Sequence, residues 1–257
     1  MLKLLIFDID GTLLPFKAIK PSQRTIKTLN SLRPKYKLVC ATGRHMLEID
    51  CVKDIQFDAY VTSDGKVVDL DGHKFIKHLN HDDVVKIVEF VKDHDLACVF
   101  TEVNDRYINK VNERVEEYHK HIAFDVPRVV DIEYVLDHEV ISATIFEDDD
   151  VIEELMSSLN HAKYTRWNSY GADISDSSGG KDLGVKEVMH YYHCDKDEVL
   201  CFGDGNNDVS MFKCCGHSCA MGNARQNLKD VAEYVSTNVR RSGLINGLKH
   251  FDILKEE

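Results

Sequence analysis

The sequence predicts an α/β protein built on a mainly parallel sheet, and three observations carry this prediction. Short apolar runs, of the kind buried inside parallel sheets, recur towards both ends of the chain. Helical patterns separate these runs, and alternating strands and helices are typical of a doubly wound α/β domain. Polar clusters follow directly after several of the runs. Because chemistry collects at the carboxyl ends of the strands in such sheets, these clusters mark the candidate site.

The elements of this domain can be placed in order along the chain. Apolar runs predict strands at residues 3–7, 36–41, 59–62, 198–202, 217–221 and 234–236. A helix is predicted after Ser22, a suitable N-cap residue, because Ile26, Leu29 and Leu32 repeat with helical spacing. Residues 67–75 predict a β-hairpin that turns at an Asp-Gly pair.

The middle of the chain predicts a second, smaller α/β module. Residues 140–146 alternate loosely between apolar and polar, as a strand does. Two amphipathic helices are predicted from apolar residues at helical spacing, namely Val84, Ile87, Val88 and Val91 in the first and Ile152, Leu155, Met156 and Leu159 in the second. We therefore expect a doubly wound, Rossmann-like core formed by residues 1–79 and 171–257, with an inserted α/β domain over residues 80–170.

The composition disfavours several classes of protein. The chain has 257 residues, and 32 basic against 44 acidic side chains give it a net charge of −12. This acidity disfavours a nucleic-acid partner and docking on anionic lipid. No apolar run reaches the roughly 18 residues of a membrane span. Asp8 and Asp10 interrupt the apolar start, so we expect no signal peptide there. We expect a cytoplasmic protein with no nucleic-acid or membrane partner.

The eight cysteines agree with this compartment. Several lie within apolar, strand-like runs, where a free thiol behaves as a small hydrophobic group. Cys214, Cys215 and Cys219 are close in sequence, but no second ligand pair at a zinc-type spacing accompanies them. We therefore expect reduced, structural cysteines.

Four polar segments contain the candidate chemistry. They are Asp8-Ile9-Asp10-Gly11, Thr42-Gly43-Arg44, Gly179-Gly180-Lys181 and Gly203-Asp204-Gly205-Asn206-Asn207-Asp208. In the first, one carboxylate can act as a nucleophile and the other can carry a proton. In the second, a hydroxyl and a glycine N–H can hold phosphate oxygens. The third offers a lysine that can offset phosphoryl charge, and the fourth offers carboxylates, which are ligands that Mg²⁺ prefers.

These four segments, in this order and each after its strand, resemble the motifs of the haloacid dehalogenase-like hydrolase superfamily. The insertion between the second and third segments is similar in position and size to the large α/β cap of the Cof-type phosphatase branch. Residues 220–224 and 231–235 also resemble the C-terminal pattern of that branch. The resemblance implies a core with an inserted cap, and a closed chamber of this kind favours small substrates.

The resemblance also implies a role for each site residue. Asp8 would be the nucleophile that forms an aspartyl-phosphate, and Asp10 would be the general acid and base. Thr42, the Gly43 N–H, Lys181 and Asn207 would bind the phosphate, while Asp8, the Asp10 carbonyl, Asp204 and Asp208 would hold Mg²⁺. Arg44 is a candidate substrate contact, and its neighbour His45 is expected to be an ordinary surface histidine.

We therefore expect a Mg²⁺-dependent phosphatase for a small phosphorylated metabolite, such as a sugar phosphate or a phosphorylated cofactor. Two alternatives stay open. The aspartyl-phosphate could be transferred to an acceptor alcohol, as in a phosphotransferase or mutase. The protein could also bind phosphorylated metabolites without catalysis, although such proteins usually lose part of the site and this chain has all of it. The sequence identifies neither the metabolite, nor the cap residues that select it, nor the oligomeric state.

Overall fold

The computed structural model describes residues 1–122, 125–166 and 169–255, and the chain divides into two compact units. The core unit comprises Met1–Phe75 and Gly179–Glu257, and the cap unit comprises Ile76–Ser178. Each unit is built on its own sheet. The predicted fold class, an α/β core from both ends of the chain with an α/β insertion, is therefore confirmed.

The described part of the core unit forms one eight-stranded sheet. Its strands are β1 (Leu4–Phe7), β2 (Lys37–Ala41), β3 (Ala59–Thr62), β4 (Val67–Leu70), β5 (His73–Ile76), β12 (Val199–Gly203), β13 (His217–Ala220) and β14 (Tyr234–Val235). They lie in the order β14-β13-β12-β1-β2-β3-β4-β5. The strands from β14 to β3 run parallel, whereas β3 and β4 run antiparallel. Because β12, β1 and β2 are neighbours, their carboxyl ends bring three of the four polar segments to one edge of the sheet.

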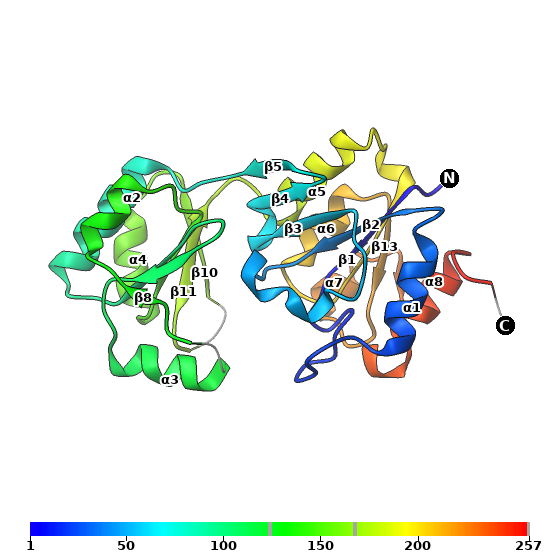
Figure 1. The fold of residues 1–257 in the computed structure, drawn as a ribbon, viewed down its shortest axis with the longest axis horizontal. Coiled ribbons are helices and arrows are strands. Elements are labelled where there is room, and N and C mark those ends of the chain that lie inside the picture. The colour runs from blue at the N-terminus through cyan, green and yellow to red at the C-terminus, as the bar shows by residue number, and fades with distance from the viewer. Residues whose placement is uncertain (123–124, 167–168, 256–257) are drawn as a thin grey trace. The chain divides into compact units, whose positions relative to one another are not determined.

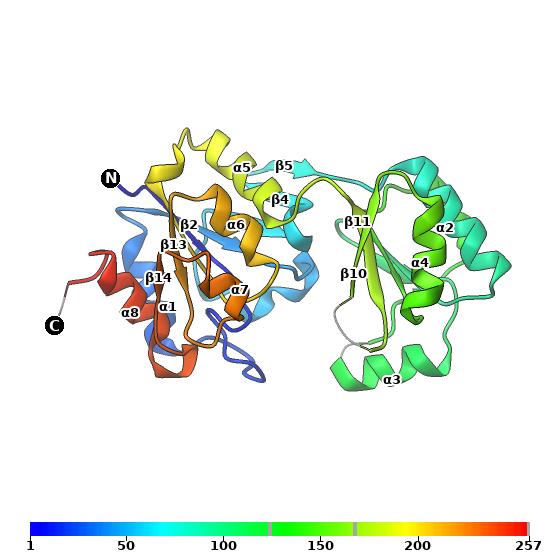
Figure 2. The ribbon, with the colours of Figure 1, turned by 180° about the vertical axis from the view of Figure 1, so that it is seen from behind.

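Helices cover both faces of the core sheet. They are α1 (Gln23–Leu32), α5 (Lys181–Tyr191), α6 (Asp208–Cys214), α7 (Gln226–Lys229) and α8 (Gly243–His250). Figure 1 shows α1 and α8 on one side of the sheet, and Figure 2 shows α5, α6 and α7 on the other. Along β1, Leu5 and Phe7 pack on the side of α1 and α8, whereas Leu4 and Ile6 pack on the side of α5 and α6. Burial on both faces is the reason that these strands are continuous apolar runs.

The cap unit has a mixed sheet and a hydrophobic core of its own. Its described strands are β6 (Cys98–Thr101), β7 (Arg106–Ile108), β8 (Arg128–Val129), β9 (Ser142–Ile145), β10 (Ala162–Arg166) and β11 (Ala172–Asp176), in the order β10-β11-β9-β6-β7-β8. The two predicted helices, α2 (His81–Asp93) and α4 (Asp149–Ser158), pack on one face. Helix α3 (Glu113–Ile122) packs on the other face through Val115. No helix is predicted there, because charged residues surround Val115 in the sequence.

The junctions between the units lie outside the predicted ones. The sequence places the insertion at residues 80–170, whereas the cap unit extends over Ile76–Ser178. The difference at the second junction arises because β11 pairs antiparallel with both β9 and β10, which makes it a strand of the cap sheet. Its residues alternate between buried and half-buried, and a search for continuous apolar runs passes over such a pattern.

Two local predictions, the N-cap of α1 and the β4–β5 turn, are confirmed. Ser22 is the N-cap of α1, and its hydroxyl accepts a hydrogen bond from the Thr25 N–H. The β4–β5 hairpin turns at Asp71 and Gly72, which both have the positive φ that a two-residue turn requires. All eight cysteines are free. Within the described ranges, no helix combines the length and the apolar character needed to cross a membrane.

Candidate active site

A buried lysine joins two of the predicted carboxylates. Asp8 follows β1, Lys181 begins α5 and Asp208 begins α6. The Lys181 ammonium donates hydrogen bonds to Asp8 Oδ1 at 2.6 Å and to Asp208 Oδ1 at 2.7 Å. Burial opposes the charged form of this lysine, but Asp208 and Asp8 outweigh burial and raise the pKa of Lys181. The lysine therefore keeps its positive charge inside the protein.

Asp8 has the environment of a controlled nucleophile. Burial raises the pKa of Asp8 well above its ordinary value, Lys181 opposes this rise and Asp208 adds to it. Lys181 engages Asp8 Oδ1, whereas none of the described residues donates a hydrogen bond to Oδ2. One oxygen of a buried carboxylate is thus oriented by a cation, while the other stays open to a further partner.

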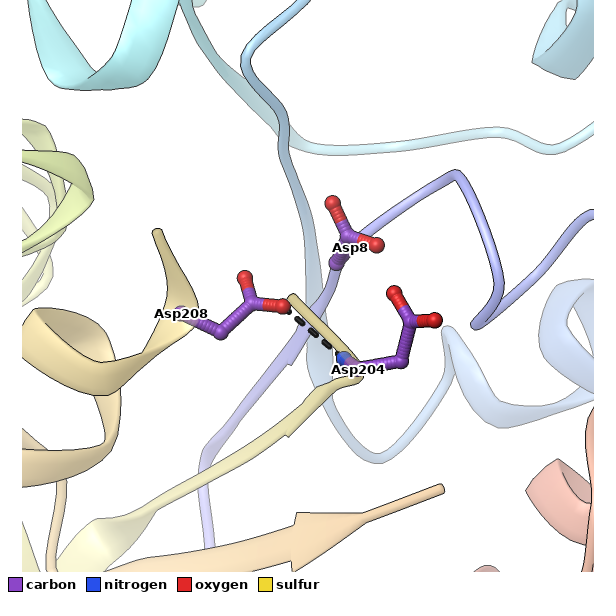
Figure 3. A group of neighbouring side chains, drawn as sticks. All are labelled: Asp8, Asp204 and Asp208. Atoms are coloured by element: carbon purple, nitrogen blue, oxygen red, sulfur yellow. Dashed lines mark hydrogen bonds between the residues drawn. The ribbon is translucent and has the colours of Figure 1, made fainter. Parts of the chain in front are cut away.

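Asp208 also shapes the loop that presents Asp204. Asp208 Oδ2 accepts hydrogen bonds of 2.9 Å from the N–H groups of Asp204 and Gly205, the first of which is drawn in Figure 3. Asn223 donates from its Nδ2 to Asp204 Oδ2 and to the Gly11 carbonyl, both at 2.9 Å. A Cβ on Gly11 would lie 1.9 Å from Asp204 Oδ2, and Gly11 has φ +80°, so both packing and backbone conformation require glycine there.

The carboxyl of Asp204 is difficult to ionise in this setting. Burial and then the neighbouring Asp208 raise the pKa of Asp204 to about 6, against a lowering effect of the hydrogen bond from Asn223. Two groups that repel each other are therefore held together by the surrounding fold. Such an arrangement is typical of a functional site, and a cation beside the two carboxylates would offset their repulsion.

Asp8, Asp204 and Asp208 form a group that fits a divalent cation. One carboxylate oxygen from each lies within 4.8 Å of the other two. Figure 3 shows the three side chains converging from β1 and from the two ends of the turn after β12. With all three ionised, their charge of −3 and the +1 of Lys181 sum to −2, which one divalent ion offsets. Hard carboxylate oxygens suit Mg²⁺.

The hydrogen bonds separate the three carboxylates by role. Both oxygens of Asp208 already accept N–H donors, so Asp208 is suited to holding its neighbours in place. Asp8 Oδ2 and Asp204 Oδ1 accept no hydrogen bond from the described part of the chain. These two oxygens are therefore the ones best placed to bind a metal ion.

Arg44 forms an ion pair with Asp10, the second aspartate of the first motif. Its Nε donates to Asp10 Oδ2 and its Nη2 to Asp10 Oδ1, both at 2.7 Å. Its Nη1 donates to the carbonyl of Glu48 at 3.1 Å. The hydrogen bonds to Asp10 raise the pKa of Arg44 despite its partial burial. Arg44 is a candidate substrate contact by its place in the sequence, whereas in the structure its guanidinium binds Asp10, the candidate acid and base.

His45 is not the surface residue that the sequence analysis expects, because it is 2% exposed. It caps the short 3₁₀ helix η1 (Met46–Glu48), where its Nδ1 accepts from the Leu47 N–H and its own N–H donates to Glu48 Oε2. The same turn supplies the Glu48 carbonyl that anchors Arg44. The role of His45 is thus structural, and the prediction of a surface position was wrong.

The remaining predicted phosphate ligands lie close together. Thr42 is buried after β2, and its hydroxyl accepts a hydrogen bond of 3.1 Å from the Arg44 N–H. Asn207 approaches Gly43, since a Cβ built on Gly43 would lie 3.3 Å from Asn207 Nδ2. Asn207 also donates to Asp64 Oδ1 at 2.8 Å. Asp64 is not among the predicted site residues, although a Ser-Asp-Gly segment directly after the strand at 59–62 is the same kind of signal as the other four.

Sites of this kind suit phosphoryl transfer, where positioning and charge stabilisation matter more than covalent machinery. The class of protein defined by this core and site is a phosphotransferring hydrolase of the α/β type. Comparison with known proteins specifies the family. Residues 5–248 match the model of the haloacid dehalogenase-like hydrolases, so the chain belongs to that family, in its Cof-type branch, and is a phosphatase.

Individual relatives agree with this assignment. The chain is 26% identical to the 5-amino-6-(5-phospho-D-ribitylamino)uracil phosphatase YitU of Bacillus subtilis, over 96% of this chain and 97% of that one. The solved structure of the HAD phosphatase BT1666 from Bacteroides thetaiotaomicron is 31% identical, with a TM-score of 0.88 and coverage of 99% and 96%. The HAD subclass IIB sugar phosphatase BT4131 is 27% identical, with a TM-score of 0.86 and coverage of 98% and 100%.

Proposed function

We propose that this protein is a Mg²⁺-dependent phosphatase that hydrolyses a small phosphorylated metabolite through an aspartyl-phosphate on Asp8. The bridge from Lys181 to Asp8 and Asp208 is the observation that supports this proposal most directly. Attack of a carboxylate on a phosphate ester brings two anions together. A fully buried ammonium beside the attacking group reduces that repulsion where water cannot.

In the first step, a carboxylate oxygen of Asp8 attacks phosphorus. The bond from phosphorus to Asp8 forms while the bond to the leaving oxygen of the substrate breaks. Asp10 donates a proton to that leaving oxygen, which departs as an alcohol. The phosphoryl oxygens are held by the Thr42 hydroxyl, the Gly43 N–H, the Asn207 amide and Lys181.

In the second step, water attacks the phosphorus of the aspartyl-phosphate. Asp10, now a carboxylate, accepts a proton from this water, and the bond between phosphorus and Asp8 breaks. Inorganic phosphate and the original Asp8 carboxylate result. The two hydrogen bonds from Arg44 hold Asp10 in one orientation, which suits a base that must meet a water molecule at a fixed place.

Mg²⁺ would be held by Asp8, Asp204 and the Asp10 carbonyl, with Asp208 keeping Asp204 in position. When bound, the ion would offset the charge that these carboxylates and the phosphoryl group bring together. The net charge of −2 on the carboxylate and lysine group supports this cofactor.

The relatives support sugar phosphates and related phosphorylated compounds as the first substrates to test. One is a sugar phosphatase, and another acts on 5-amino-6-(5-phospho-D-ribitylamino)uracil. Both substrate classes are small phosphomonoesters. We therefore infer a sugar phosphate or a phosphorylated cofactor precursor as the substrate of this chain.

Phosphate release from p-nitrophenyl phosphate and from a panel of sugar phosphates, measured with and without Mg²⁺, tests the proposal. The wild type should release phosphate only with the metal, and Asp8→Asn should release none. Asp69→Asn, an equal change of charge on strand β4, should retain activity. A folded wild type that is inactive across the panel would leave a phosphate-binding protein and contradict the proposal.

The same assay distinguishes hydrolysis from phosphotransfer. With an acceptor alcohol such as glucose or glycerol present, a hydrolase should still yield mainly inorganic phosphate. A phosphotransferase should instead yield the phosphorylated alcohol in proportion to acceptor concentration. Mass spectrometry of the products measures that ratio directly.

A further inference from the structure

The loop between β3 and β4 forms a fifth part of the site, beside the four predicted segments. Its residues Ser63–Gly65 form the 3₁₀ turn η3. The Ser63 N–H donates to the Arg44 carbonyl at 2.9 Å, and the Asp64 N–H donates to the Thr42 carbonyl at 3.2 Å. A Cβ on Gly65 would lie 2.2 Å from the Gly180 carbonyl oxygen, so this loop also packs directly on the segment before Lys181.

The backbone of this loop is held in an uncommon conformation. Ser63 and Asp64 both have φ of +50°, in the left-handed region that non-glycine residues rarely occupy. Aspartate and asparagine tolerate this region better than most residues do. Such strain persists where the surrounding structure holds it and is often associated with functional sites.

The Asp64 carboxylate lies among three of the groups assigned to phosphate binding. Its Oδ1 accepts the hydrogen bond from Asn207 Nδ2. A Cβ built on Gly43 would lie 3.1 Å from Asp64 Oδ1 and 3.4 Å from Oδ2. The charge of Asp64 also acts on Lys181, after the larger effects of burial, Asp208 and Asp8.

Asp64 differs from the other carboxylates of the site in how its charge is compensated. Asp8 and Asp208 share the ammonium of Lys181, and Asp10 is paired with Arg44. Asp204 belongs to the group that fits a divalent cation.

Among the contacts of the described residues, the partner of Asp64 is the neutral amide of Asn207. A carboxylate that forms no direct ion pair with any described residue, and that only the more distant Lys181 offsets in part, is thus placed beside a site for a dianion.

We propose that Asp64 is a positioning residue that orients the Asn207 amide and weakens the hold of the site on phosphate, so that the product can leave. This inference rests on the proposed phosphatase function and concerns the affinity of that site. A carboxylate near a bound anion lowers the affinity of the site for that anion by simple repulsion. Asp64 nevertheless has a use at this position, because its Oδ1 accepts the hydrogen bond that orients the Asn207 amide.

The variant Asp64→Asn separates charge from shape. It keeps a side-chain oxygen for Asn207 and tolerates the positive φ, but it carries no charge. Isothermal titration with inorganic phosphate, in buffer containing MgCl₂, gives the affinity directly. We expect Asp64→Asn to bind phosphate about tenfold more tightly than the wild type, with the difference shrinking as salt is raised. Product inhibition should strengthen in parallel, and kcat should fall where release limits turnover.

The direction of this change is diagnostic, because damage to the site would weaken phosphate binding. Asp69→Asn is the matched control in the same unit, and its phosphate affinity should equal that of the wild type. If Asp64→Asn does not fold, Asp64→Gly replaces it in the test, because glycine also tolerates the positive φ. Asp64→Gly should likewise bind phosphate more tightly than the wild type. Unchanged or weaker phosphate binding in these variants would overturn the inference.

Failure of this inference and failure of the proposed function have different signatures. If the wild type hydrolyses phosphate esters but Asp64→Asn binds phosphate as the wild type does, the phosphatase proposal stands and the role of Asp64 is wrong. If the wild type binds phosphate without turnover, the function is wrong, while the comparison of the two affinities still decides the role of Asp64.

Discussion

The guanidinium of Arg44 holds the carboxylate of Asp10 through two parallel hydrogen bonds of 2.7 Å. This pairing joins the loop after β2 to the loop after β1. A further hydrogen bond, from Arg44 Nη1 to the Glu48 carbonyl, holds the guanidinium in place. Asp10 is 39% exposed, so the pair lies at the open side of the site and not in its buried centre. A planar fork of this kind restricts both the position and the rotation of the carboxylate.

Replacing Arg44 should therefore lower kcat more than it raises KM. Arg44→Met removes the fork, and Arg44→Lys keeps the charge but not the two-point geometry, so we expect kcat to fall about 10- to 100-fold in both. Arg33→Met, which removes an exposed partner of Asp58, is the control and should leave turnover unchanged. Steady-state kinetics decide the matter. A rise in KM with normal kcat would instead make Arg44 a substrate contact.

Removing the central lysine should destabilise the fold. In Lys181→Met, Asp8 and Asp208 lose the cation between them while remaining buried, and the loss of one partner of a buried pair costs about 3–5 kcal/mol. Lys186→Met lies on the same helix, but its side chain is 59% exposed, so it should cost less than about 1 kcal/mol. Urea unfolding measures both. Adding Asp208→Asn to Lys181→Met should recover part of the loss, and an equal cost for the two lysines would contradict this account.

Asp204 should make the metal-free protein less stable as the pH rises. The pKa of Asp204 in the folded state is about 6, above the ordinary 3.8. Protonation of Asp204 therefore stabilises the folded state fully below pH 3.8, and this stabilisation is lost as the pH rises through 6. At pH 7.5 this cost is at most about 3 kcal/mol. Without metal, Asp204→Asn should melt at a higher temperature than the wild type at pH 7.5. This difference in melting temperature should be smaller at pH 5.

Magnesium supplies the complementary half of this test. Millimolar Mg²⁺ should raise the melting temperature of the wild type at pH 7.5, since it binds the folded state preferentially, and should leave Asp204→Asn almost unaffected. Scanning calorimetry of the wild type and of Asp204→Asn, each in chelator and in MgCl₂, gives the four melting temperatures. A wild type that melts at the same temperature with and without the ion would count against the metal assignment.

Asn223 should support metal binding without contacting the substrate. Its amide donates to Asp204 Oδ2 and the Gly11 carbonyl, while its Oδ1 accepts from the Val239 N–H, so the amide can point only one way. Asn223→Leu should weaken Mg²⁺ binding about tenfold by titration calorimetry, as partners of metal ligands usually do.

A matched asparagine distinguishes this role from general support of the fold. Asn246 donates to the Thr237 hydroxyl, away from Asp204, so Asn246→Leu should bind Mg²⁺ as the wild type does. Raising Mg²⁺ should restore part of the kcat of Asn223→Leu. Normal Mg²⁺ affinity in Asn223→Leu would show that Asn223 only supports the backbone.

Local pattern was sufficient to determine the class of fold and four of the five segments of the site. The apolar runs are continuous because both faces of the core sheet are covered, and the polar clusters lie where parallel strands end. Asp8, Thr42 and Asp204 could therefore be assigned to one sheet edge before any coordinate was known. The alternating strand β11 and the helix α3 escaped prediction because their apolar signals are short and interrupted.

The sequence by itself thus determined the α/β class with an inserted cap, and through its resemblance to a known family it named Asp8, Asp10, Asp204 and Asp208 but not Asp64. Only the tertiary structure decided which side chain meets which: Arg44 meets Asp10 across 34 residues, and Asn207 meets Asp64 across 143. It also buried His45, which the sequence alone placed at the surface. The physical reason is that periodicity reports which face of an element is buried, whereas a hydrogen-bond partner depends on strand order and loop conformation, which bring distant residues together.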